Sequence, residues 1–450
     1  MLTKETDIII VGSGPGGATL ARELAQSAAG LGITLLERGR DWRPSPLYGT
    51  YPGGMLYTDK ASFLTTQEGL SVVRPLLVGG ATSMYCGCAA RPLPWWQSAY
   101  NIDLESYAQA AIEELGILPL PPTLRGIAST RIAEAAAEIG QDWFAQDKFM
   151  RPRRSHNGFD CAANCMLGCR CGAKWNAAEW VDTAVTEGID LWTGARVEQV
   201  LAENGRVAGV WGKWRGKPFA VYAKNVILAA GGIGSPLILQ QSGLTAAGQG
   251  MTMDTTIMVY GHAPYKGIGD EPPMTWSFAD DDLGVLYSTL IDPWLNYPLV
   301  MLRKGPAYPL TWRRWGHTLG VMIKLKDEIS GFVQAQKRGF TISKGVTSSD
   351  RQRLAAAEQV AGRILQQASC DSDSIFTTPL RGTHPSGTVR IGEMLTTDLE
   401  TEIQNLYVCD ASVFPQALAR PTVLTIIALA KRLAEHLLND HSLPQGARHL

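Results

Sequence analysis

The feature that most constrains this chain is a glycine-rich turn between two short apolar runs near its start. Residues 7–11 read DIIIV, a run of branched side chains typical of a strand buried on both faces. Gly12, Gly14 and Gly17 follow as GxGxxG, and residues 18–29 carry a helical pattern. Such glycines give a tight turn, a close backbone approach to a pyrophosphate and close packing of helix on strand. The order predicts a Rossmann-like unit that binds a dinucleotide.

A second predicted strand supports this interpretation. Residues 33–39 read ITLLERG and place Glu37 at the end of the strand, twenty residues after Gly17. A carboxylate at this distance accepts hydrogen bonds from an adenosine ribose. GxGxxG alone is weak evidence, but strand, turn, helix, strand and acid in register support one another.

Size and charge limit the classes of function. A chain of 450 residues exceeds one compact core and predicts two domains. Its 41 basic and 42 acidic residues leave it nearly neutral, which gives no electrostatic reason to expect a nucleic-acid partner. No eighteen-residue apolar run predicts a membrane span, and no leader pattern precedes residue 7. We therefore expect a soluble, cytoplasmic protein.

The remaining patterns predict an α/β fold with two interleaved parts. Residues 225–230, NVILAA, predict another buried strand, and GGIGSP then opens a helix at residues 237–241. Residues 251–369 contain alternating stretches such as TLGVMIKLK that suit an antiparallel sheet, while KRGFTISKGVTSSDRQR predicts a solvated turn and helix start. We expect a discontinuous Rossmann-like domain and an α+β substrate domain built on an antiparallel sheet. The first would comprise residues 1–95, 180–250 and 376–450, and the second residues 96–179 and 251–375.

Four groups of segments, in chain order, resemble the glucose-methanol-choline (GMC) flavin oxidoreductases. They are residues 12–17, RPLLVGGATS at 74–83, NVILAAGGIGSPLILQQSG at 225–243, and the C-terminal HPSGT and NLYVCDASVFP. The resemblance implies a bound FAD and oxidation of a CH–OH group of a sugar, polyol, glycoside or other alcohol by hydride transfer to flavin N5. It leaves the electron acceptor open among dioxygen, a quinone and a redox protein.

The resemblance also implies a set of cofactor-binding residues. They are Gly12, Ser13, Gly14, Pro15, Gly16, Gly17, Glu37, Arg38, Gly79, Gly80, Thr82, Ser83, Gly231, Asp410, Ala411, Thr422 and Val423. Asp410 ends a predicted strand, and the helix after it would point its positive end at the flavin pyrimidine. Met84 and Tyr85 stand where some relatives carry a histidine bonded to FAD, so we expect non-covalent binding.

His384 stands where this family has its catalytic histidine. Alcohol oxidation requires loss of the hydroxyl proton, and an imidazole titrating near neutrality can accept it. The usual second catalytic residue, Asn or His, falls at Pro421, which has no side-chain donor or acceptor. Arg420 and Thr422 are the nearest polar candidates for its role. Proline also suits the first turn of a helix, and an apolar helical pattern follows.

A cluster of four cysteines, Cys161, Cys165, Cys169 and Cys171, allows three interpretations. Closely spaced thiolates can hold an iron-sulfur cluster or another metal, can form a disulfide, or can be structural free thiols. The segment resembles the cysteine loop of family dehydrogenases that relay electrons to a haem partner, and also metal-free loops. No metal is favoured.

Two functional alternatives stay open beside alcohol oxidation. The missing partner at Pro421 would suit a redox-neutral lyase of the same fold that keeps FAD as structure. The cysteine loop would suit a flavin subunit that relays electrons to a partner.

Overall fold

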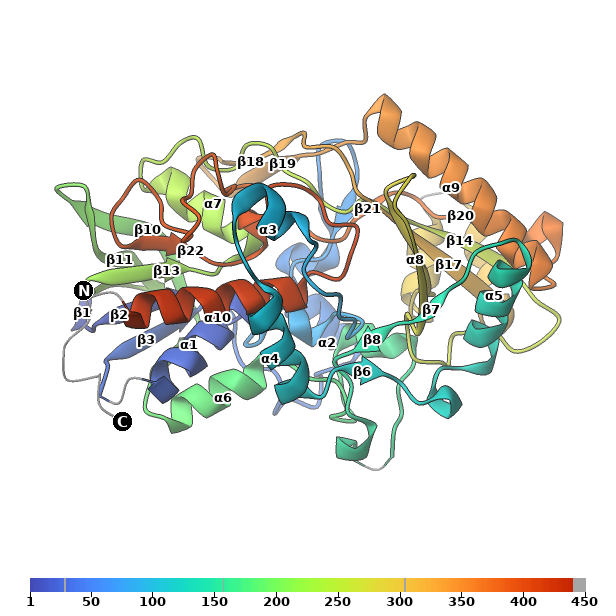
Figure 1. Cartoon of the computed structure of the whole chain (residues 1–450), viewed down its shortest axis with the longest axis horizontal. Coiled ribbons are helices and arrows are strands. Elements are labelled where there is room, and N and C mark those ends of the chain that lie inside the picture. The colour runs from blue at the N-terminus through green and yellow to red at the C-terminus, as the bar shows by residue number, and fades with distance from the viewer. Residues whose placement is uncertain (28–29, 157, 303–304, 440–450) are drawn as a thin grey trace.

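Four distant parts of the chain form one parallel sheet. The computed structural model describes residues 1–27, 30–156, 158–302 and 305–439 (Figure 1). The strand order is β22 (Leu406–Val408), β13 (Asn225–Leu228), β2 (Ile8–Val11), β3 (Ile33–Glu37) and β9 (Asp190–Thr193). All four pairings are parallel. Every residue of β2, β3, β13 and β22 is buried, as their unbroken apolar runs predict.

Helices from both ends of the chain pack beside this sheet. Helix α1 (Pro15–Ser27) begins within the GxGxxG segment, three residues before the predicted start. It packs against α6 (Ala178–Thr186) and α10 (Val423–Asn439), and the three lie together in the left half of Figure 1. Helix α7 (Gly231–Gln241) follows β13 and ends where predicted, but it begins six residues earlier than expected and includes GGIGSP itself. The two ends of the chain thus build one layer.

A second, four-stranded sheet adjoins the parallel one. Its order is β1 (Leu2–Glu5), β12 (Lys217–Tyr222), β11 (Arg206–Trp214) and β10 (Ala195–Glu203). Strands β10 and β11 contact β3 and β13. The two sheets share one hydrophobic core.

The largest sheet occupies the right half of Figure 1. Its order is β4 (Leu64–Thr65), β5 (Ser71–Val72), β21 (Arg381–Gly382), β14 (Thr256–His262), β17 (Thr318–Leu325), β16 (Val285–Thr289), β15 (Trp276–Asp280) and β7 (Phe144–Ala145), with β20 (Phe376–Thr377) beside β14. The central strands β14, β16 and β17 pair antiparallel and are wholly buried. Helices α5 (Ile127–Glu138) and α9 (Ser348–Gln367) pack against this sheet. The antiparallel sheet expected within residues 251–369 is therefore present.

The large sheet also recruits strands from outside that region. Strands β4, β5, β20 and β21 pair with it, although the predicted division groups their residues with the nucleotide-binding segments. The division into two domains stays a prediction.

The remaining α-helices and strands are α2 (Tyr51–Leu56), α3 (Trp95–Tyr100), α4 (Glu105–Leu115), α8 (Asn296–Leu302), β6 (Leu118–Pro119), β8 (Asp147–Lys148), β18 (Phe332–Ala335) and β19 (Phe340–Ser343).

The prediction that residues 337–353 are solvated is wrong for several of them, because Ile342, Lys344, Val346 and Asp350 are buried. Lys344 is fully buried and pairs with Asp327 at 2.8 Å, because it follows β19 into the protein interior. Helix α9 does begin within this stretch, and Thr347 and Asp350 form a capping box at its N-terminus.

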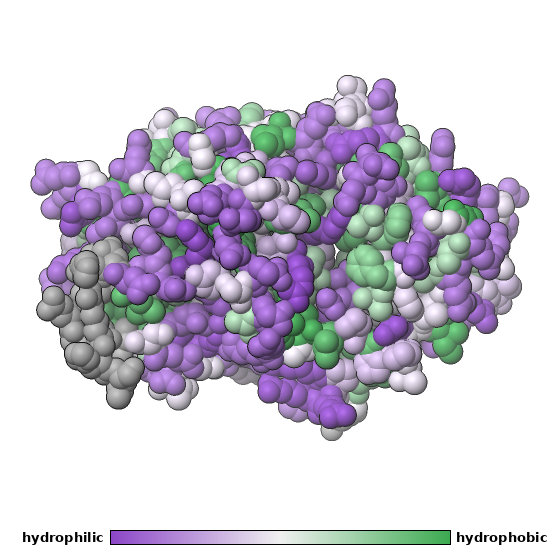
Figure 2. Space-filling view, viewed as in Figure 1, coloured by the Kyte–Doolittle hydropathy of each residue, from purple (hydrophilic) through white to green (hydrophobic). Residues whose placement is uncertain are grey.

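The molecular surface is largely hydrophilic in the view of Figure 2, with hydrophobic residues between the polar ones in small groups. In the described part of the chain, no helix combines the length and the apolarity that crossing a bilayer needs.

Candidate active site

Three glycines of the turn after β2 are required by close backbone contacts. A Cβ at Gly12 would lie 2.4 Å from the Ala229 carbonyl oxygen, and one at Gly16 would lie 2.1 Å from the Cys409 carbonyl oxygen. A Cβ at Gly17 would lie 1.9 Å from the Gly12 carbonyl oxygen. The turn is therefore packed against the ends of β13 and β22, and side chains are excluded there.

Gly14 is different from these three glycines. A Cβ on Gly14 would meet no described atom within 4 Å. Packing within the protein therefore does not explain a glycine at this position, whereas approach of a phosphate to the backbone does. A second glycine turn, formed by Gly79 and Gly80, lies directly against Gly14. A Cβ added to Gly80 would come within 2.9 Å of the Gly14 Cα. Pro15 is the first residue of α1.

Ser13 joins the acid at the end of β3 to the second glycine turn. Its N–H and its hydroxyl both donate to Glu37 Oε2, at 2.9 and 2.6 Å. The N–H of Gly39 donates to the other Glu37 oxygen at 2.6 Å, and the N–H of Gly79 donates to Ser13 Oγ at 3.2 Å. Glu37 is buried, while Arg38 beside it is exposed.

Thr82 and Ser83 hold the second glycine turn from within. Thr82 Oγ1 donates to the Gly79 carbonyl at 2.6 Å and accepts the N–H of Ala177 at 2.9 Å. Ser83 Oγ accepts from Asn176 Nδ2 at 2.9 Å. Both side chains are buried, and their hydrogen bonds stabilise the conformation of this turn.

Asp410 forms a second carboxylate cluster at the same edge of the sheet. It accepts the N–H of Gly231 at 2.8 Å, the Ser235 hydroxyl at 2.5 Å and the N–H of Ser412 at 2.8 Å. Burial raises its pKa. The hydroxyl oxygen of Ser412 is buried and has no hydrogen-bond partner among the described residues. Residues 411–422 separate Asp410 from α10, the long terminal helix that follows it.

The predicted cofactor residues therefore gather where β2, β3, β13 and β22 end. The carboxyl ends of parallel strands form the usual ligand-binding edge of such sheets. Thr422 and Val423 lie near the same edge, at the start of α10. The first turn of that helix packs against the glycine turn, since the Ile426 side chain would lie only 3.3 Å from a Cβ added to Gly16.

The segment after His384 connects to this edge through backbone hydrogen bonds. Gly387 N–H donates to the Ala411 carbonyl at 3.2 Å, and Val389 N–H donates to the Ser412 carbonyl at 2.9 Å. The two predicted parts of the site, cofactor residues and histidine, are thus adjacent.

His384 is held by a carboxylate and flanked by an amine. Its Nδ1 lies 2.8 Å from Asp254 Oδ2, and the other Asp254 oxygen accepts the Ala419 N–H at 2.8 Å. Lys324 Nζ lies 3.3 Å from His384 Nε2 and 3.5 Å from Nδ1. The carboxylate fixes the proton on Nδ1 and leaves Nε2 as the acceptor. The His384 side chain is 23% exposed, so a small molecule can reach it.

The electrostatic environment favours a neutral imidazole. Burial, and then the positive charge of Lys324, lower the pKa of His384 from its ordinary value of 6.5, and Asp254 partly opposes both effects. Burial also lowers the pKa of Lys324, against the attraction of Asp254. A neutral imidazole with Nδ1 protonated can accept a proton at Nε2 near neutral pH.

The structure separates the candidates around Pro421. Arg420 turns to the surface, where it pairs with Asp281 at 2.7 Å. Thr422 is buried, and its carbonyl accepts the N–H of Ile426 in the first turn of α10. The helix begins at Val423, so Pro421 lies two residues before it rather than within its first turn.

Sequence reasoning missed Asp254 and Lys324, which contact His384. A lysine within the apolar run VMIKL was the available signal for Lys324, and an acid between MTM and TTIMV was the signal for Asp254. Asp254 also has a left-handed backbone, φ 46°, which a non-glycine residue rarely adopts.

The cysteine loop adopts a compact arrangement of free thiols. Cys169 and Cys171 have their sulfur atoms 3.8 Å apart, and Cys165 is buried close to them. A hydrogen bond with the Cys161 thiol, and then burial, raise the pKa of Cys165 to about 11, against the effect of Cys169. Among the residues that the structure describes, no three His, Cys, Asp or Glu side chains are grouped to hold a metal ion. The iron-sulfur interpretation therefore has no geometric support.

Lys174 ties this loop to the second glycine turn. Its Nζ donates to the carbonyls of Cys165, Ser83 and Tyr85 at 2.9, 3.2 and 2.7 Å. The loop thus supports the segment that follows the predicted flavin-binding glycines.

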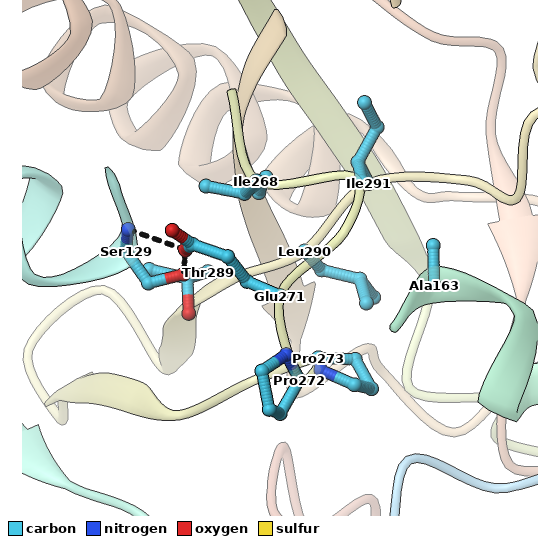
Figure 3. A pocket seen from close by; sticks show the side chains of 9 residues that line it. All are labelled: Ser129, Ala163, Ile268, Glu271, Pro272, Pro273, Thr289, Leu290 and Ile291. Carbon is cyan, nitrogen blue, oxygen red and sulfur yellow. Dashed lines mark hydrogen bonds between the residues drawn. The ribbon is translucent and has the colours of Figure 1, made fainter. Parts of the chain in front are cut away.

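A separate hollow beside α5 lacks a free reactive group (Figure 3). Glu271 lies within it and points at Ser129, accepting that residue's N–H and hydroxyl at 2.8 and 2.7 Å. Its other oxygen accepts the Ala128 N–H at 2.8 Å. The carboxylate caps α5, so this hollow is structural.

Comparison with known proteins identifies the family. The GMC oxidoreductase models match residues 54–269 with the N-terminal part and residues 333–430 with the C-terminal part. The chain belongs to the GMC oxidoreductase family, and the resemblance stated from its motifs is confirmed.

Relatives with named activities act on alcohols. The chain is 24% identical to long-chain-alcohol oxidase FAO4B of Arabidopsis thaliana, over 96% of this chain and 67% of that protein. It is 28% identical to 2-methyl-1,2-propanediol dehydrogenase of Mycolicibacterium austroafricanum, over 53% of this chain and 51% of that protein. An uncharacterized GMC-type oxidoreductase of Mycobacterium tuberculosis is 26% identical over 95% of this chain and 75% of its own length.

A solved structure shares the fold. Pyridoxine 4-oxidase from Mesorbium loti superposes with a TM-score of 0.70 at 17% identity, covering 97% of this chain and all of that one. The mixed α/β fold class is thereby supported.

Proposed function

We propose that this chain is an FAD-dependent enzyme that oxidises a CH–OH group, with His384 as the base. One observation carries the proposal: a partly exposed His384, its Nδ1 held by Asp254, lies beside the cluster of glycines and carboxylates at the edge of the parallel sheet. Membership of the GMC family and the alcohol-oxidising relatives support it.

The residues at the sheet edge fit FAD. Gly14 presents open backbone at the start of α1, where a pyrophosphate meets the positive end of the helix. Glu37 accepts three hydrogen bonds, and since a carboxylate has about four acceptor sites, one is left for a ribose hydroxyl. The unpaired Ser412 hydroxyl beside Asp410 suits the flavin end. Bound FAD would supply the acceptor for the hydride.

The chain's own residues would handle the proton. The substrate hydroxyl would donate its proton to His384 Nε2 as the carbinol C–H electron pair leaves, and the C–O bond would become a carbonyl. Asp254 would keep the imidazole in the required tautomer and stabilise the positive charge that forms on it. Two electrons would then pass to an acceptor such as dioxygen, a quinone or a redox protein.

Anaerobic mixing of the flavin-loaded protein with a panel of alcohols tests the proposal. The panel is 1-butanol, benzyl alcohol, glycerol and glucose, and loss of the oxidised flavin absorption reports turnover. At least one alcohol should reduce the flavin. Absence of reduction by every alcohol would contradict the proposal and favour the redox-neutral lyase.

Substitution of the base sharpens the test. His384→Asn should bind FAD and be reduced by dithionite as the wild type is, but be reduced by the alcohol about 10²- to 10⁴-fold more slowly. His317→Asn is the matched control, because that exposed imidazole contacts the Tyr265 carbonyl. Equal rates for His384→Asn and His317→Asn would remove His384 from the mechanism.

A further inference from the structure

Among the described residues four lysines are buried, and one of them is not paired like the others. Lys148, Lys174, Lys324 and Lys344 are each at most 3% exposed. A buried ammonium is costly unless acceptors surround it, so its partners are informative. The four therefore form an internal comparison of how this protein stabilises buried positive charge.

Three of these lysines are supplied with oxygen acceptors. Lys148 donates to the carbonyls of Cys86 and Pro273 at 2.6 and 2.8 Å. Lys174 donates to three carbonyls of the cysteine and glycine loops. Lys344 pairs with Asp327 at 2.8 Å and donates to the Glu328 carbonyl at 2.7 Å. Each has a structural role that its partners explain.

Lys324 lacks such partners in the described part of the chain. No carbonyl or carboxylate oxygen there accepts a hydrogen bond from its Nζ, whose contacts are the two ring nitrogens of His384. Asp254 does not supply the missing acceptor, because its hydrogen bonds go to His384 and to the Ala419 N–H and none joins it to Nζ. The amine therefore carries N–H donors that no oxygen of the described residues receives.

The geometry leaves the basic nitrogen free. Nζ is nearly equidistant from Nδ1 and Nε2, at 3.5 and 3.3 Å. A donor placed along the in-plane lone pair of Nε2 would lie much farther from Nδ1, so the amine sits over the ring. Nε2 is then left free to accept a proton, with the amine close beside it.

We propose that Lys324 is a catalytic residue that donates a hydrogen bond to the substrate oxygen, the role that Pro421 cannot fill. The segment that contains Pro421 lies beside His384, since the Ala419 N–H donates a hydrogen bond to the same Asp254 that holds His384. As the hydroxyl proton moves to His384 Nε2, negative charge grows on the oxygen, and the Lys324 ammonium stabilises it. This assignment rests on the proposed alcohol oxidation and names the group that would hold the alcohol.

Two variants separate the effect of the Lys324 hydrogen-bond donor from the effect of its positive charge. Lys324→Met removes both, and Lys324→Gln keeps N–H donors without charge. We expect flavin content and reduction by dithionite to be unchanged, while reduction by the best alcohol of the panel slows about 100-fold in Lys324→Met. Lys324→Gln should recover part of that loss. Lys326→Met, just beyond β17, removes a nearby charge without contacting His384 and should stay within about twofold of wild type.

The pH profile provides a readout that a structural role would not move. The charged groups acting on His384 are Lys324 from β17 and Asp254 from the segment before β14, while Arg420 is turned to Asp281. Loss of the Lys324 charge should raise the pKa of His384, moving the midpoint of flavin reduction upward in both variants. Melting temperatures should be unchanged or higher, because an ammonium without oxygen partners is removed.

Binding of tert-butanol distinguishes failure of this assignment from failure of the proposed function. This alcohol has no hydrogen on its carbinol carbon, so it binds without reacting, and perturbation of the flavin absorption reports its Kd. We expect the Kd to rise about tenfold in Lys324→Met and not in Lys326→Met. If no alcohol reduces the wild type but this dependence holds, the oxidation is wrong and the hydroxyl-binding role stands. If Lys324→Met matches wild type in reduction rate and Kd, the assignment is overturned.

Discussion

The glycine turn and the His384 cluster lie side by side but satisfy their polar groups differently. At the sheet edge, Glu37 and Asp410 each accept three hydrogen bonds from N–H and hydroxyl donors. At His384, the buried amine of Lys324 faces ring nitrogens and no oxygen. The proposed function accounts for this difference: a site that only binds can be completed by the fold, whereas a reacting site would keep groups ready for charge that develops later.

The largest effect is expected from a substitution that disrupts the glycine turn. Gly17→Ala would place a Cβ 1.9 Å from a backbone carbonyl, which cannot move without shifting α1. We expect a loss of about 4 kcal/mol or more in the free energy of unfolding, and little flavin-loaded protein. Thermal unfolding and bound flavin per chain measure this. Gly14→Ala is the matched control: it should fold with near wild-type stability but bind FAD more weakly, and equal behaviour of the two would contradict the distinction drawn between these glycines.

A smaller effect is expected where the carboxylate orients the base. Asp254→Asn removes the negative charge that fixes the proton on His384 Nδ1. Flavin reduction by an alcohol should slow about 100-fold, with flavin content unchanged. Stopped-flow absorbance under anaerobic conditions measures the rate. A variant that reacts as fast as wild type would show that Asp254 has no part in positioning His384.

At the glycine turn, loss of the Glu37 carboxylate should weaken the affinity for FAD without changing the rate of flavin reduction. Glu37→Gln should raise the Kd for FAD about tenfold, since it replaces a charged acceptor by a neutral one. At saturating FAD the rate of flavin reduction should equal that of wild type. Glu203→Gln, at the exposed end of β10, should change neither quantity. A slower reduction in saturated Glu37→Gln would mean that the two clusters are coupled.

The smallest effect is the pH dependence of the wild type. Because the pKa of His384 is lowered, the imidazole stays neutral to more acidic pH than an ordinary histidine. The rate of flavin reduction should fall as pH drops through a midpoint below 6.5, and change less than about twofold from pH 7 to 9. A midpoint above 6.5 would show that Asp254 outweighs burial and Lys324.

The two clusters also differ in how far the sequence could predict them. The glycine turn, Glu37 and Asp410 follow from local patterns, because strand, turn and acid are close along the chain. Asp254 and Lys324 are 130 and 60 residues from His384, and only the antiparallel pairing of β14 with β17 brings their strands together. Lys324 looks like the solvent face of an alternating strand, but β17 is covered on both faces. Long-range sheet pairing is what local patterns cannot supply.

The position of β22 at the edge of the parallel sheet has a consequence for biosynthesis. Its partner β13 is made midway through the chain, and β22 and α10 leave the ribosome nearly 400 residues after β2. At about 5 to 20 residues per second, this interval is about 20 to 80 s. During that time the nascent chain would expose the apolar face of α1 that α10 later covers. Flavin capture by this protein is therefore expected after translation rather than during it, with a period in which chaperones can bind the unfinished layer.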